Sequence, residues 1–71
     1  MPRDEFKIRR LLEDGISIEV SANDFDKYKL SRMVESAVEG NAILSIRDSD
    51  KLDMYDMRRI AEEGKRNVIF R

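Results

Sequence analysis

The sequence predicts an α/β fold: a small two-layer domain in which helices lie on one face of a short, mainly parallel, three-stranded sheet. Three observations support this prediction. A ten-residue pattern occurs three times, each copy is followed by one of the three glycines, and each glycine precedes a short stretch rich in apolar residues. We therefore expect three helix–Gly–strand units, at residues 4–20, 26–47 and 53–71, stacked like a short solenoid in one domain spanning 1–71.

The repeated pattern predicts the three helices. Its copies read DEFKIRRLLE at 4–13, DKYKLSRMVE at 26–35 and DMYDMRRIAE at 53–62. The leading Asp of each copy is a predicted N-cap, because its side-chain oxygen can accept a hydrogen bond from a first-turn amide. Apolar residues then recur at the spacing of an amphipathic helix. The predicted core stripes consist of Ile8, Leu11 and Leu12, of Leu30, Met33, Val34, Ala37 and Val38, and of Met57, Ile60 and Ala61.

The three glycines predict where the helices end. Gly15, Gly40 and Gly64 each follow one copy of the pattern. The residue just after a helix often adopts a left-handed conformation, which glycine reaches without a steric cost. We therefore expect all three glycines to occupy this position.

The stretches after the glycines predict strands at residues 16–20, 42–47 and 68–71. Each alternates side chains between two faces, which indicates a sheet that is buried on one side only. In the first strand, Ile16 is expected on the buried face. The connections are long enough for parallel pairing, and right-handed crossovers running in one direction give the order 1-2-3 with the helices on one face.

Composition argues against most catalytic chemistry. The chain of 71 residues has 14 Lys and Arg, 15 Asp and Glu, no Cys and no His. The absence of His removes the commonest general base and metal ligand, and the absence of Cys removes disulfides and thiolate sites. No apolar run reaches the roughly 18 residues of a membrane span. We therefore expect a cytoplasmic protein that has no membrane span, is not an enzyme and uses no cofactor.

Three aspartates in residues 48–53 raise the possibility of a calcium loop. The spacing departs from that of an EF-hand loop, because Asp53 stands where glycine is required and Arg59 where a bidentate Glu is required. A turn followed by an N-cap is the favoured interpretation. Under this interpretation Asp48 and Asp50 could at most bind a divalent cation weakly. We therefore predict no metal site.

Each pattern copy also carries an aromatic residue and an arginine four positions apart, which share the outer face of a helix. These residues could stabilise their own helix through cation–π and Arg–Glu pairs. Alternatively, they could bind a protein partner, because Tyr and Arg are enriched at binding hot spots. We call these six residues the outer helix ladder: Phe6, Arg10, Tyr28, Arg32, Tyr55 and Arg59.

The second candidate surface is the face of the sheet that points away from the helices, which we call the open sheet face. Its expected members are Ile43, Arg47, Ile69 and Arg71. The edge of the last strand would also lack a covering element. A chain of this size has a thin core, so pairing of two such edges about a two-fold axis predicts a homodimer.

The stretch KLDMYDMRRIAEEGKRNVIF resembles a strand–helix repeat tail of uncharacterised bacterial proteins. The resemblance covers residues 51–70 and implies a bacterial or phage origin without a particular activity. It is carried by Leu52, Ile60, Ala61, Gly64, Val68 and Phe70.

These observations favour a non-catalytic protein–protein interaction module that associates with itself, as a small adaptor, inhibitor or immunity-type protein. The partner's identity is not encoded in any motif. The alternative is a nucleic-acid or nucleoprotein-binding protein that uses the basic residues of the last unit. These are Arg58, Arg59, Lys65, Arg66 and Arg71.

Overall fold

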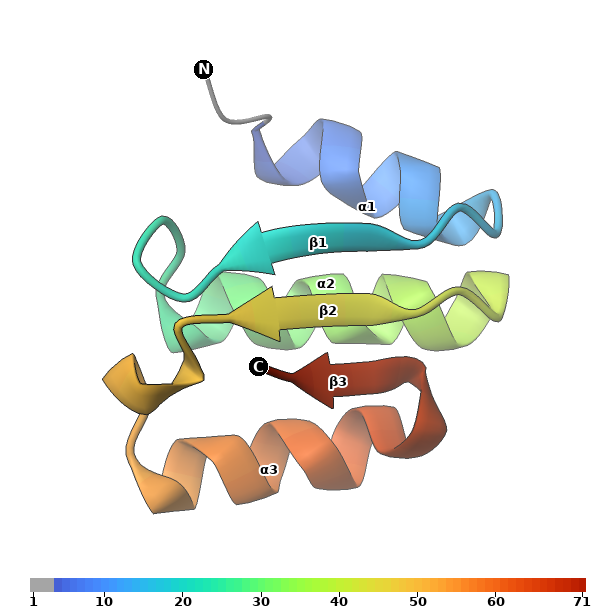
Figure 1. Cartoon of the computed structure of the whole chain (residues 1–71). Helices are drawn as coiled ribbons and strands as arrows, with labels where there is room; N and C mark the ends of the chain where they lie inside the picture. The colour runs from blue at the N-terminus through green and yellow to red at the C-terminus, as the bar shows by residue number, and fades with distance from the viewer. Residues whose placement is uncertain (1–3) are drawn as a thin grey trace.

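The computed structural model describes residues 4–71 and alternates helices with strands along the chain (Figure 1). Two short 3₁₀ turns, η1 (Ser49–Lys51) and η2 (Lys65–Asn67), precede α3 and β3, respectively. The main elements are α1 (Glu5–Glu13), β1 (Ile18–Ser21), α2 (Lys27–Gly40), β2 (Leu44–Arg47), α3 (Met54–Gly64) and β3 (Val68–Phe70).

The three strands form a parallel sheet in the order β1-β2-β3, which confirms the predicted topology. Val20 of β1 pairs with Ile46 of β2, which in turn pairs with Phe70 of β3. Figure 1 shows α2 behind the sheet, with α1 and α3 to either side. Within residues 4–71, no helix lies over the front face of the sheet (Figure 1).

The two layers differ in width for a geometric reason. Packed helices lie about 8–10 Å apart, whereas neighbouring strands are only about 4.8 Å apart. Three helices therefore form a layer about twice as wide as three strands, and the outer helices extend beyond the sheet. Accordingly, α1 lies beside β1 and α3 lies beside β3 in Figure 1.

The predicted N-caps are confirmed for all three helices. Asp4, Asp26 and Asp53 each accept a hydrogen bond from the backbone amide three residues further on, at 2.8, 2.9 and 2.8 Å. Each bond satisfies one of the amides that a helix N-terminus leaves without an intrahelical partner. The same local device therefore begins all three helices.

Every main helix and strand contributes to the core, and most of the predicted stripe residues are buried. Two predictions were wrong: Ile16 is 48% exposed and Val38 is 45% exposed. The Ile16 amide donates to Leu11 O, so this residue belongs to the turn that ends α1, and β1 starts later. Val38 faces an open groove beside residues 63–67, where α3 ends. The buried apolar residues are Ile8, Leu12, Val20, Leu30, Met33, Val34, Ala37, Ala42, Leu44, Ile46, Ile60 and Val68.

The predicted left-handed conformation occurs at only one of the three glycines. Gly15 has a φ of +88° just after α1. After α2 the left-handed residue is Asn41 (φ 55°), and after α3 a positive φ of 49° falls on Lys65. The prediction was therefore wrong for the other two glycines, which belong to their helices.

Close packing explains these two glycines instead. A Cβ atom on Gly40 would lie 1.9 Å from the backbone oxygen of Leu12, where the ends of α1 and α2 meet. A Cβ atom on Gly64 would lie 2.7 Å from Val34 Cγ1. Both glycines are needed because a neighbouring element occupies the space of a side chain.

Candidate protein-binding surfaces

One member of the outer helix ladder has a role inside the fold. Arg32 on α2 donates two hydrogen bonds to the carboxylate of Glu5 on α1, at 2.6 Å and 3.0 Å. These bonds hold the pKa of Glu5 below its ordinary value. Arg32 therefore joins two helices, whereas the sequence suggested pairing with Tyr28 and Glu35 on its own helix.

The aromatic rings of the ladder are exposed, as expected for an outer face. Phe6, Tyr28 and Tyr55 are 69%, 65% and 68% exposed. Within residues 4–71, the one cation–π contact places Lys27 Nζ 5.4 Å from the centre of the Tyr28 ring. The ladder arginines thus do not stack on the aromatic residues four positions before them.

The remaining ladder residues are distributed over separate shallow grooves. Tyr28 and Arg59 line a groove between α2 and α3. Arg59 also lines a second groove on α3, together with Tyr55. Phe6 and Arg10 line a third, on α1. The structure therefore sets Phe6 and Arg10 apart, whereas Tyr28 and Tyr55 line two grooves that share Arg59.

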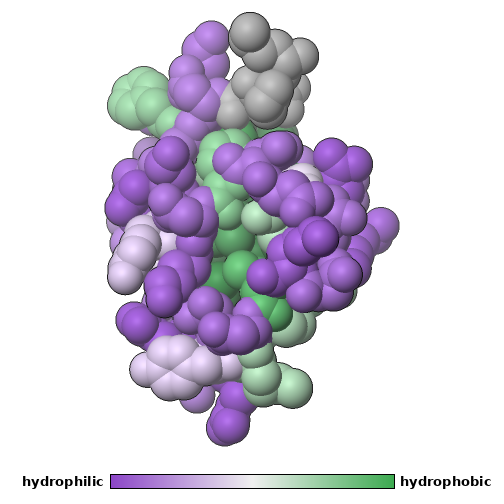
Figure 2. Space-filling model, turned by 90° about the vertical axis from the view of Figure 1, so that its left-hand side faces the viewer, coloured by the Kyte–Doolittle hydropathy of each residue, from purple (hydrophilic) through white to green (hydrophobic). Residues whose placement is uncertain are grey.

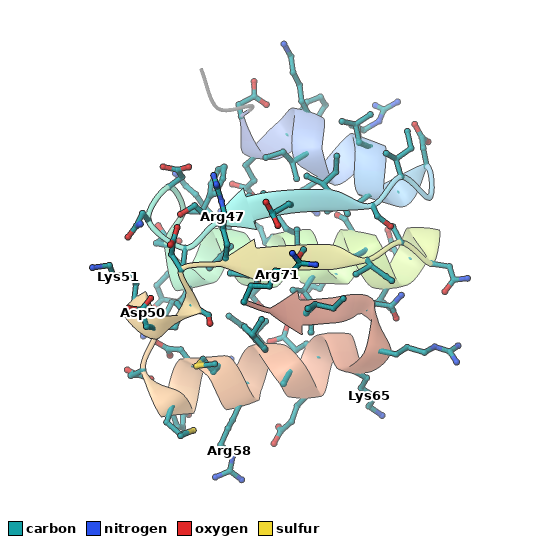
Figure 3. All side chains as sticks on the ribbon, in the orientation of Figure 1. Arg47, Asp50, Lys51, Arg58, Lys65 and Arg71 are labelled. Carbon is teal, nitrogen blue, oxygen red and sulfur yellow. The ribbon has the colours of Figure 1, made fainter. Side chains whose placement is uncertain are left out.

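The open sheet face gathers its four predicted residues on β2 and β3 or directly beside them, with Ile43 just before β2 and Arg71 just after β3. Ile43 and Ile69 are 39% and 41% exposed, and both arginines are exposed as well. In Figure 3, Arg47 lies over the upper part of the sheet and Arg71 over its middle strand. The structure thus places Arg47 and Arg71 over the face without helices, and the role of the four residues in binding stays a prediction.

Glu19 on β1 completes the open sheet face and was not among the predicted residues. Its carboxylate oxygens lie 4.0 Å from Arg47 Nε and 3.8 Å from Arg71 Nη1. Because β2 separates β1 from β3, the Arg71 side chain must cross the middle strand to approach Glu19. The alternation of residues 16–20 placed Glu19 on this face, but its proximity to the arginines depends on the pairing of the strands.

Ser45 lies at the middle of the same face, paired in register with Glu19 on one side and Ile69 on the other. Its Oγ is shielded from solvent and has no hydrogen-bond partner within residues 4–71. Buried side-chain polar atoms have a partner in the large majority of cases. An unpaired hydroxyl is therefore a distinctive feature of this face.

The edge at which the strands end is held by polar contacts. Asp48 accepts a hydrogen bond from Ser21 Oγ at 2.7 Å, and Ser49 Oγ donates to the backbone oxygen of Arg71 at 2.7 Å. Within residues 4–71, no cluster of three His, Cys, Asp or Glu side chains could hold a metal ion. The Asp48 carboxylate thus serves the turn that follows β2.

Figure 2 views this edge and shows a narrow hydrophobic strip between two hydrophilic flanks. Phe25 and Leu52, which immediately precede the caps of α2 and α3, are partly buried against the core, as is Phe70 on β3. These contacts close the core between the sheet and the helices.

The basic residues of the last unit do not converge on one surface. Figure 3 shows Arg58 and Lys65 pointing outward on the α3 side, whereas Arg71 lies over the sheet. A protein that follows a nucleic-acid backbone usually presents its basic residues on one face. This arrangement gives the nucleic-acid alternative little support.

Comparisons of the chain with protein-family models, curated proteins and solved structures found no match. The resemblance of residues 51–70 to bacterial proteins therefore stays a prediction. Among the helices within residues 4–71, none combines the length and the apolar character that crossing a membrane requires.

Proposed function

We propose that the chain is a non-catalytic protein–protein interaction module that binds its partner through the open sheet face. The observation that carries this proposal is the one-sided coverage of the sheet: within residues 4–71 no helix lies over its front face (Figure 1). Ile43, just before β2, and Ile69 on β3 are consequently left partly exposed. Their burial by a partner would be favourable, because it removes apolar surface from water.

The open sheet face supports this role better than the outer helix ladder does. Arg32 is hydrogen-bonded to Glu5, and Phe6 and Arg10 line a groove on α1 that shares no residue with the grooves of Tyr28, Tyr55 and Arg59. The residues of the open sheet face lie together on neighbouring strands, and the small spacing between strands concentrates their side chains. The surface that binds a partner needs such contiguity.

Self-association is a further part of this proposal, and the partner would then be a second copy of the chain. The sequence suggested that two β3 edges pair in a homodimer. In Figure 1, α3 lies beside that edge, which leaves less room for a second strand there. We therefore propose that the homodimer forms through the open sheet face.

The biological setting that we propose is a small adaptor, inhibitor or immunity-type protein in the cytoplasm of a bacterium or in a phage-infected cell. Its support is the sequence: the resemblance of residues 51–70 and the absence of His and Cys from the chain.

Site-specific photo-crosslinking tests the proposed surface. A benzophenone amino acid is placed at Ile69 in one variant and at Tyr55 on α3 in the control variant, and both are irradiated in bacterial cells. These positions are 41% and 68% exposed, so neither is shielded from a partner. We expect protein adducts from position 69 and few from position 55, and an adduct of twice the chain's mass would identify a homodimer. Adducts from position 55 alone, or none from position 69, would contradict the proposal.

A further inference from the structure

The charges on the open sheet face point to the chemistry of the partner, an inference that rests on the proposed function. Arg47 and Arg71 approach the same single carboxylate, that of Glu19, at 4.0 and 3.8 Å. Both separations are longer than a hydrogen bond. Within the described residues, neither guanidinium donates a hydrogen bond to a side chain, so their donors are available, and the two guanidinium groups share the one carboxylate of Glu19.

The pair between α1 and α2 shows how an arginine of this chain is bound when it serves the fold. Arg32 reaches both oxygens of Glu5 at 2.6 and 3.0 Å. Such a two-pronged contact is the strong form of an Arg–carboxylate interaction. Arg47 and Arg71 make only long-range ion pairs with Glu19. A carboxylate of the partner could instead form a two-pronged hydrogen-bonded contact with these arginines.

The neighbouring groups define the rest of the surface. The hydroxyl of Ser45 has no partner and lies beside Glu19 in the sheet register. The isoleucines supply an apolar area, with Ile43 four residues before Arg47 on the same side of β2. Two positions four residues apart along a strand are separated by about 13 Å, which matches positions i and i+4 of an extended partner segment.

We infer that the open sheet face binds an acidic segment of a protein partner, extended, with an apolar residue followed four positions later by Glu or Asp. The apolar residue would contact Ile43 and Ile69, and the carboxylate would bind Arg47 and Arg71. Glu19 holds these two arginines in the free protein and gives them up to the partner. Glu19 thereby also discriminates against a partner that carries no negative charge, because its own contacts would be lost without replacement.

A peptide titration of the full chain tests this inference. The probe is the ten-residue peptide Leu-Thr-Leu-Thr-Leu-Thr-Glu-Thr-Glu-Thr, in which each Glu follows a Leu by four positions and lies on the same side of the extended chain. The matched control peptide carries Gln in place of each Glu. Amide signals in two-dimensional NMR spectra report where the peptide binds, and we expect the shifts at residues 43–47 and 69–71.

Three variants separate the groups that recognise the peptide. Arg71→Ala should weaken binding about tenfold, because a charge-assisted contact is lost. Glu19→Gln should strengthen binding several-fold, because it removes the internal competitor. Arg58→Ala, on the far side of α3 (Figure 3), is the control and should leave the affinity unchanged. Raising the salt concentration should weaken binding of the Glu peptide more than binding of the Gln peptide.

The outcomes also distinguish this inference from the proposed function. Equal affinity for the Glu and Gln peptides, or weaker binding by Glu19→Gln, would overturn the acidic partner while leaving a protein-binding sheet face intact. Shifts confined to the helix surface would overturn both. Tight binding of a short DNA duplex that Arg71→Ala abolishes, with no binding of the Glu peptide, would overturn the inference in favour of nucleic acid.

Discussion

Two regions of the molecule contain the same kinds of polar residues: the contact between the helices α1 and α2, and the open sheet face. They differ in whether these residues make close hydrogen bonds. Between the helices, Arg32 binds Glu5 at 2.6 Å, and Ser36 Oγ accepts from Arg9 at 3.0 Å while donating to Glu13 at 3.1 Å. On the sheet, the Arg–Glu separations are 3.8 and 4.0 Å and the Ser45 hydroxyl has no partner. The fold uses the first set of polar groups, whereas the two arginines of the second set make only long contacts and its serine hydroxyl makes none.

Backbone packing separates the two regions in the same way. The ends of α1 and α2 approach so closely that Gly40 has no room for a side chain. The open sheet face has side chains extending into solvent and no opposing layer within residues 4–71. Substitutions in the first region should therefore reduce stability, and substitutions in the second should change binding.

The largest loss of stability is expected from Gly40→Val. Its Cβ would overlap the backbone oxygen of Leu12 at 1.9 Å, and backbone at a helix end cannot move aside cheaply. We expect the free energy of unfolding to fall by at least about 3 kcal/mol, measured by urea denaturation. Glu39→Val, at an exposed position of the same helix, is the control. Similar losses from the two variants would show that the helices do not meet as described.

A pair of serine substitutions compares the two regions directly. Ser36→Ala removes a buried hydroxyl that makes two hydrogen bonds, and it should reduce stability by about 1–2 kcal/mol. Ser45→Ala removes a hydroxyl without a partner, and it should leave stability unchanged or raise it slightly. Thermal melts of both variants test the comparison, which would fail if Ser45→Ala proved the more destabilising.

The smallest expected effect is the pH dependence of the Glu5–Arg32 pair. Hydrogen bonds from Arg32 lower the pKa of Glu5 from its ordinary value of 4.5. The contribution of the ionised carboxylate is therefore present above pH 4.5 and is lost as the pH falls through the lower pKa of the folded state. We expect Glu5→Gln to melt at a lower temperature than the parent at neutral pH, with the difference shrinking in acid. A difference that stayed constant down to pH 2 would contradict this assignment.

The sequence predicted the features that depend on neighbouring residues and on the lengths of the connections. The caps at Asp4, Asp26 and Asp53 need only a helix N-terminus, and the parallel order follows from connection length and handedness. The sequence-based prediction was wrong at Gly40 and Gly64. A glycine that is needed because a neighbouring element leaves no room for a side chain cannot be told in the sequence from one that is needed for a positive φ.

The candidate surfaces show the same limit. The sequence placed the arginines of the ladder and the sheet on exposed faces, which is a matter of periodicity. It could not show that Glu5 binds Arg32 or that Glu19 lies near Arg71, because those contacts join residues 27 and 52 positions apart. Only the packing of α1 on α2 and the pairing of the strands bring them together.

The central claim is that the α1–α2 contact stabilises the fold and that the open sheet face binds a partner. Its most direct test compares Arg32→Ala with Arg71→Ala. Each variant is measured twice, by thermal melting and by titration with the Leu–Thr–Glu peptide. We expect Arg32→Ala to lower the melting temperature and to keep the parent's affinity for the peptide. Arg71→Ala should keep the melting temperature and lose about tenfold in affinity. If Arg71→Ala lowers the melting temperature as much as Arg32→Ala and leaves the affinity unchanged, the open sheet face is not a binding surface.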